Sequence, residues 1–137
     1  MDKAASYLGL ARKAGMLALG EQQCIDALQK GRAKLFLLAA DAAENTVSYA
    51  HSLSGGHRAP LMSLPWSKDE LSAMLGRAGC AMLIFTDLPF AAQFAAALAE
   101  TIPEWRSTAA LLEARRNKAQ RRKAAPRKHD AGGRRRT

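Results

Sequence analysis

The chain has 137 residues, of which 48% are hydrophobic, and a formal net charge of +9. This length predicts one domain with its own hydrophobic core and a terminal extension. Its apolar runs are far shorter than the roughly 20 residues that a membrane-spanning helix needs, and charges at Asp2 and Lys3 do not fit a signal peptide. We therefore expect a cytoplasmic protein.

The predicted elements alternate between helices and strands. Apolar residues at helical spacing predict helices, and continuous apolar runs bounded by turn residues predict buried strands. The expected order is helix Lys3–Ala14, edge strand Met16–Leu19, helix Gly20–Lys30, strand Lys34–Ala40, helix Ala43–Leu53, strand Leu61–Leu64, helix Ser67–Leu75, strand Cys80–Phe85 and helix Leu88–Ile102. This alternation predicts an α/β fold, a three-layer α/β/α sandwich with a mixed four-stranded sheet and a basic C-terminal tail.

Capping residues mark several helix ends. Gly15 is expected to end the first helix in the left-handed conformation. Ser67 and Glu70 have the spacing of a capping box, in which each side chain binds the other residue's backbone amide. Asp41 and Asp87 each precede a predicted helix and are expected to cap it.

The positive charge is concentrated after residue 102. Residues 1–102 contain nine Lys and Arg against nine Asp and Glu, whereas residues 103–137 contain twelve against three. A terminal block of like charge often forms an arm that binds nucleic acid, although a tail that only aids solubility is the alternative. Residues 107–125 favour a basic helix, residues 126–137 favour disorder, and we expect Trp105 to pack back on the domain.

The residue patterns give no indication of a catalytic or metal site. The glycines do not form a phosphate-binding or dinucleotide-binding loop. Cys24 and Cys80 lie in apolar segments without CxxC spacing, which is typical of buried core thiols. His51 and His57 have no neighbouring cysteine or carboxylate cluster that would complete a zinc site. These patterns therefore do not favour an enzyme.

Three segments together resemble a known family. They are "LGLARKAG", "GEQQCIDALQKGRAKLFLLAADAAENT" and "AMLIFTD". Over residues 4–100, the chain resembles the kink-turn RNA-binding ribosomal proteins of the L7Ae type, and especially their small bacterial YlxQ-like members. The resemblance implies a monomeric α/β/α sandwich that binds RNA, either ribosomal RNA or RNA associated with the ribosome. It implies no reaction, cofactor, membrane or small-molecule substrate.

The resemblance also assigns roles to residues of the second helix. Gln22 and Gln23 occupy the positions of an Asn and a Glu that bind guanine edges at sheared G·A pairs, and a carboxamide can both donate and accept there. Gly20 matches a glycine that lets RNA approach closely, and Lys30 matches a basic position that faces the RNA backbone. Asp26 stands where the best-known members have a lysine, so its charge would repel phosphate.

The loop of residues 76–79 corresponds to a family loop that packs on a flipped-out nucleotide. Taken together, the resemblance and the basic tail predict an RNA-binding site formed by Gly20, Glu21, Gln22, Gln23, Lys30, Arg77, Ala78, Gly79, Arg115, Arg116, Arg121 and Arg122. Three alternatives stay open at this stage. The glutamines could be ordinary surface residues, the chain could be the RNA-recognition fragment of a larger rRNA-modifying protein, or it could be a protein-interaction module of the same fold.

Overall fold

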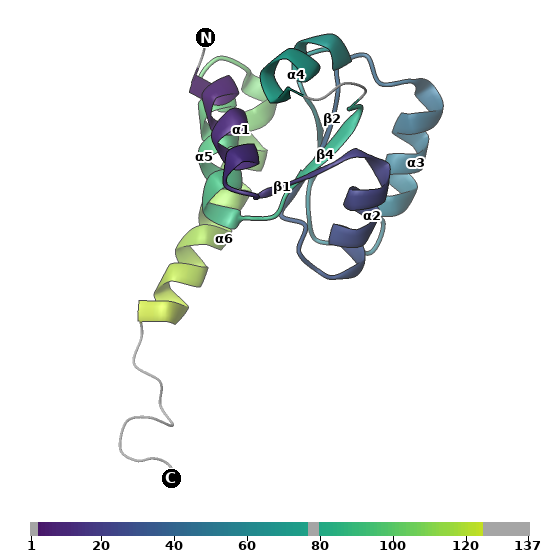
Figure 1. The fold of residues 1–137 in the computed structure, drawn as a ribbon. Coiled ribbons are helices and arrows are strands. Elements are labelled where there is room, and N and C mark those ends of the chain that lie inside the picture. The colour runs from purple at the N-terminus through teal and green to yellow at the C-terminus, as the bar shows by residue number, and fades with distance from the viewer. Residues whose placement is uncertain (1–2, 77–79, 125–137) are drawn as a thin grey trace.

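The computed structural model describes residues 3–76 and 80–124, and Figure 1 shows how they are arranged. Its elements in chain order are α1 (Lys3–Lys13), β1 (Leu17–Leu19), α2 (Gly20–Gln29), β2 (Leu35–Leu38), α3 (Glu44–Ser54), β3 (Leu61–Ser63), α4 (Lys68–Leu75), β4 (Met82–Phe85), α5 (Leu88–Ala99), the 3-10 helix η1 (Pro103–Trp105) and α6 (Arg106–Ala124). The predicted order of helices and strands is confirmed, with small differences at their ends.

The four strands form a mixed sheet in the order β1-β4-β2-β3, with β1 at one edge as predicted. Strand β4 pairs antiparallel with both β1 and β2, whereas β2 and β3 are parallel. Strands β1, β2 and β3 therefore end at the same end of the sheet, which we call the carboxyl end, and β4 begins there. The opposite end, where β1, β2 and β3 begin and β4 stops, is the amino end.

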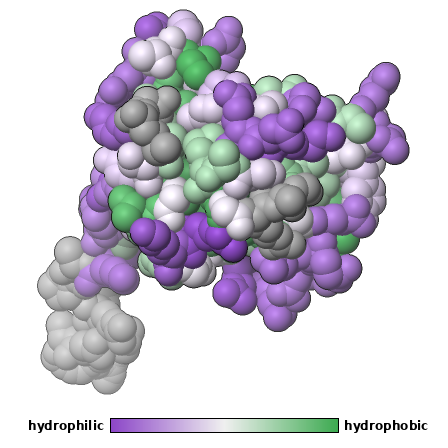
Figure 2. All heavy atoms as spheres, turned by 45° about the horizontal axis from the view of Figure 1, so that its top comes forward, coloured by the Kyte–Doolittle hydropathy of each residue, from purple (hydrophilic) through white to green (hydrophobic). Residues whose placement is uncertain are grey.

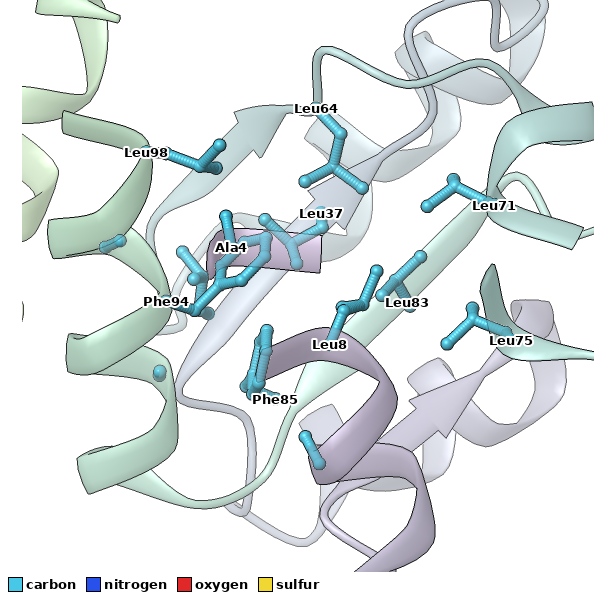
Figure 3. Packing of buried hydrophobic residues seen from close by; sticks show 14 of the residues in the cluster. Ala4, Leu8, Leu37, Leu64, Leu71, Leu75, Leu83, Phe85, Phe94 and Leu98 are labelled. Carbon is cyan, nitrogen blue, oxygen red and sulfur yellow. The ribbon is translucent and has the colours of Figure 1, made fainter. Parts of the chain in front are cut away.

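Helices cover both faces of the sheet, which confirms the three-layer α/β/α sandwich. Along β2, Leu35 and Leu37 pack with α1, α4 and α5, whereas Phe36 and Leu38 pack with α2 and α3. Figure 3 shows Leu37 among side chains of the first group. All four β2 side chains are buried, and burying each one stabilises the fold by about 1.5–3 kcal/mol.

The caps agree with the sequence at two helices and differ at a third. The Ser67 side chain accepts from the Glu70 amide while the Glu70 carboxylate accepts from the Ser67 amide, so the capping box is confirmed. Asp87 accepts from the Phe90 amide at 3.0 Å and caps α5, as predicted. The prediction for Asp41 is wrong, because its Oδ1 accepts from the Lys68 amide at 2.8 Å and so joins the end of β2 to the start of α4.

Both cysteines are free thiols in the core, as the sequence predicted. Burial, reinforced by the neighbouring Cys80, raises the pKa of Cys24 to about 12. Within residues 3–76 and 80–124, His, Cys, Asp and Glu form no group of three that could hold a metal ion. None of the helices in these ranges is long and apolar enough to cross a membrane.

The core continues past residue 102, where the sequence placed the start of the basic segment. The Trp105 side chain is only 2% exposed and its ring meets that of Phe94 edge-on, with centroids 5.9 Å apart. Leu112 of α6 is fully buried in the same cluster. The predicted packing of Trp105 is thus confirmed. Helix α6 packs on α5, and its last turns extend beyond the sheet in Figure 1.

Candidate nucleic-acid interface

The start of α2 forms the first part of the predicted site, at the carboxyl end of the sheet. Gly20 has a φ of 85°, a backbone conformation that is strained for residues with a side chain. The glycine is therefore needed for the sharp turn from β1 into the helix. Leu19 occupies the N-cap position and supplies no side-chain cap to the first turn. Among the described residues, the first-turn amides, at the positive end of the helix dipole, therefore lack the usual side-chain partner at the N-cap.

Gln22 and Gln23 have different roles in the structure. The Gln23 Oε1 accepts a hydrogen bond from the Leu19 amide at 2.9 Å, so its carbonyl oxygen already stabilises the helix start. Gln22 and its neighbour Glu21 are exposed, and Gln22 makes no side-chain hydrogen bond to any residue that the structure describes. Of the glutamine pair, Gln22 is thus the side chain whose donor and acceptor are both available to a ligand.

Lys30 lies far from Gln22 along the helix. Eight residues separate them, which corresponds to about 12 Å at 1.5 Å per residue. The Lys30 ammonium lies 3.2 Å from the Asp26 carboxylate, and both side chains are more than half exposed. Such a surface pair contributes about 0–1 kcal/mol, so Asp26 partly neutralises Lys30 without fixing it.

The loop predicted to pack on a nucleotide connects α4 to β4. Arg77, Ala78 and Gly79, three of the predicted site residues, lie outside the described residues. The residue that follows them, Cys80, lies at the carboxyl end of the sheet, because β4 begins there two residues later. The start of α2 is close by, since Leu19 pairs with Leu83 in the register of β1 and β4.

The exposed surface around this end is mostly polar. Figure 2 turns the top of Figure 1, where α4 lies, toward the viewer, and hydrophilic residues surround a smaller hydrophobic area there. A surface of this kind favours a polar ligand, because burying it against an apolar partner would leave polar groups unpaired.

Comparison with known proteins identifies the family. A model of the ribosomal protein L7Ae/L30e/S12e/Gadd45 family matches residues 2–92, which is more than half of the chain. The chain belongs to this family. It is 35% identical over 76 residues to a protein named RNA-binding protein YlxQ from Enterococcus faecium, covering 56% of this chain and 73% of that one.

A solved structure has a similar fold. It is that of a protein with unknown function from Bacillus halodurans, with a TM-score of 0.65 and 28% sequence identity. The alignment covers 98% of that chain but only 72% of this one. Because the family match stops at residue 92, η1 and α6 lie beyond it.

The predicted arginines of α6, all beyond the family match, do not form one surface. Arg116 lies 3.8 Å from the Glu113 carboxylate, so its charge is partly compensated. Arg121 is exposed. Arg115 and Arg122 instead line a cleft at the amino end of the sheet, the end opposite to Gln22. The structure therefore divides the predicted site between the two ends of the sheet.

The same cleft contains basic residues that the sequence did not single out. They are Lys34, Arg58 and Lys118. Lys34 precedes β2 and Arg58 precedes β3, so both belong to the part of the chain in which positive and negative charges balance. The sequence signal was a basic residue shortly before each of two predicted strands, which parallel pairing brings to the same end of the sheet.

Proposed function

We propose that this protein binds structured RNA through the start of α2 at the carboxyl end of the sheet. Membership of a ribosomal protein family and similarity to a protein named RNA-binding protein YlxQ support this proposal. The observation that carries it is the exposed Gln22, which follows the left-handed Gly20 at a helix start without a side-chain cap. An amide side chain in that position can read base edges through a paired donor and acceptor.

The neighbouring charges favour bases over phosphates at this point. Glu21 lies in the first turn of α2 beside Gln22 and would repel a phosphate. A carboxylate is, however, a strong acceptor for the N–H groups of a guanine edge. We propose that Glu21 and Gln22 together contact guanines exposed where an RNA backbone bends sharply, as in a kink-turn with sheared G·A pairs, and that the RNA is ribosomal or associated with the ribosome.

The test compares two RNAs that differ only at the bend. One contains tandem sheared G·A pairs and the other has Watson–Crick pairs in their place. Gln22→Ala should reduce discrimination between them by about 1–3 kcal/mol, which is roughly 5- to 150-fold in relative affinity. Gel-shift titrations at low salt measure both dissociation constants.

Gln29→Ala is the matched control, because Gln29 is an exposed glutamine at the other end of the same helix. It should leave discrimination unchanged. Equal losses on both RNAs with Gln22→Ala would show that Gln22 does not read bases. Absence of any RNA binding by the whole chain would reject the proposed function and favour a protein-interaction role.

A further inference from the structure

A cleft of about 470 Å³ at the amino end of the sheet brings together three segments that are distant in the sequence. They are the loop after α2, the loop between α3 and β3, and one face of α6. Its basic side chains, which define the basic cleft, are Lys34, His57, Arg58, Arg115, Lys118 and Arg122. Aspartate and glutamate are absent from the described residues that line it.

Backbone hydrogen bonds hold the two loops in place. The Phe36 amide donates to the Pro60 carbonyl at 2.9 Å, which ties the starts of β2 and β3 together. The Lys34 amide donates to the Phe85 carbonyl at 2.8 Å, which fixes the same loop to the end of β4. Lys34 lies two residues before Phe36, and Arg58 lies two residues before Pro60. These hydrogen bonds therefore hold the backbone that carries both basic side chains.

One arginine of helix α6 binds the loop between α3 and β3. The Arg115 Nη1 donates to the Arg58 carbonyl at 3.0 Å. Burial, and then the nearby Arg58 charge, lowers the pKa of Arg115. The ion pairs formed among residues 3–76 and 80–124 include none of the basic cleft side chains. The cleft therefore concentrates positive charge without an acidic partner, which is unfavourable until an anion binds.

The arrangement on α6 fits several phosphates in a row better than one isolated anion. Arg115, Lys118 and Arg122 follow the spacing i, i+3, i+7, which places them on one helix face over about 10 Å. The small Ala119 lines the cleft between them and leaves room for a ligand to approach. Arginine forks bind phosphate oxygens in pairs, and lysine adds a point charge.

We propose that the basic cleft is a second RNA-binding surface that holds phosphates of the RNA backbone, an inference that rests on the proposed function. Helix α2 connects the two surfaces, because Gly20 lies at the carboxyl end and Leu28 lines the cleft. These two residues are eight positions apart, which corresponds to about 12 Å at 1.5 Å per residue. One RNA that is read at Gln22 would thus be held by its backbone at the opposite end of the sheet.

The test removes three charges from the cleft and keeps the Arg115 contact that docks α6. The variant Lys34→Gln/Lys118→Gln/Arg122→Gln should bind RNA with a shallower dependence of log affinity on log salt. Three lost phosphate contacts reduce the slope by about 2 to 3, since each contributes about 0.7 in a single strand and about 0.9 in a duplex. Over a tenfold rise in salt, the affinity of the variant would then fall at least about 100-fold less than that of the wild type.

The matched control, Lys3→Gln/Lys13→Gln/Arg106→Gln, removes two exposed lysines and one exposed arginine that do not line the cleft. It should keep the wild-type slope. The cleft variant should still discriminate sheared from paired RNA, because phosphate contacts do not specify sequence. Circular dichroism checks folding, and Lys118→Gln alone, with an expected slope change of about 0.7 to 0.9, is used if the triple variant misfolds.

The outcomes separate this inference from the proposed function. Equal slopes for the cleft and control variants, with discrimination intact, would overturn the cleft proposal and leave the proposed function standing. If the wild type bound no RNA, both would fail. A titration with tripolyphosphate would then show whether the cleft is instead a site for a free anion, with binding lost in the cleft variant and kept in the control.

Discussion

Ending the chain at Ile102 is expected to remove part of the hydrophobic core as well as the basic segment. This truncation deletes Trp105, which is 2% exposed, and Leu112, which is fully buried. It also uncovers the face of α5 that packs against η1 and α6, including Phe94, whose ring contacts Trp105. The charge boundary read from the sequence therefore does not mark where packing ends.

The expected loss of stability can be worked from those two side chains. Replacing a buried tryptophan by alanine costs about 3–5 kcal/mol, and replacing a buried leucine costs about 2–5 kcal/mol. Their deletion together should lower the free energy of unfolding by about 5–10 kcal/mol. The free energy of unfolding of a domain of this size is about 5–15 kcal/mol in total, so the chain ending at Ile102 should keep little or none of its stability.

Urea denaturation followed by far-ultraviolet circular dichroism tests this expectation. The chain ending at Ala124 is the control, because it keeps η1 and α6 while lacking residues 125–137. Its midpoint should lie near that of the whole chain. If the chain ending at Ile102 unfolded at the same urea concentration as this control, the inferred contribution of Trp105 and Leu112 to the core would be refuted.

Three further predictions concern single side chains. Gln23→Ala removes the hydrogen bond to the Leu19 amide and should lower the free energy of unfolding by about 1 kcal/mol in urea titrations, whereas an unchanged midpoint would show that the bond is dispensable. Asp26→Lys removes the carboxylate that partly neutralises Lys30 and should tighten RNA binding at low salt by gel shift; unchanged affinity would place the RNA elsewhere. Cys24 should resist alkylation at pH 8 in the native protein and react in urea, and rapid native alkylation would contradict its burial. Its folded pKa of about 12 exceeds the roughly 8.5 of a free thiol, so the free energy of unfolding should fall as pH rises through that interval.

The sequence predicted the elements well because their signals are local. The run Leu35–Leu38 has few alternatives to a buried strand, and Ser67 with Glu70 forms a helix cap from residues three apart. Asp41 was misassigned because its partner, the Lys68 amide, is 27 residues away and comes near only in the folded sheet. Local patterns thus predict where helices begin and end, whereas bonds between elements require the topology.

In the candidate site, too, local features could be predicted from the sequence, and contacts between distant segments could not. The exposure of Gln22 follows from its place on the helix, but the bond from the Leu19 amide to Gln23 depends on one side-chain conformation. The cleft was not predicted because the net charge of residues 1–102 is zero, and a total does not show where in the fold the positive side chains gather. Lys34 and Arg58 meet only because β2 and β3 are parallel neighbours, and alternation of helices and strands does not determine that order.

The two tryptophans lie on the same side of the sheet, which determines what intrinsic fluorescence can report. Trp66 and Trp105 both have Phe94 as a ring neighbour, with centroid distances of 6.1 and 5.9 Å. The opposite cluster, which packs α2 and α3 on the sheet, contains no tryptophan among its residues in the described chain. Tryptophan emission therefore monitors the layer of α1, α4 and α5, and local opening of α2, the helix that presents Gln22, would be silent in that signal.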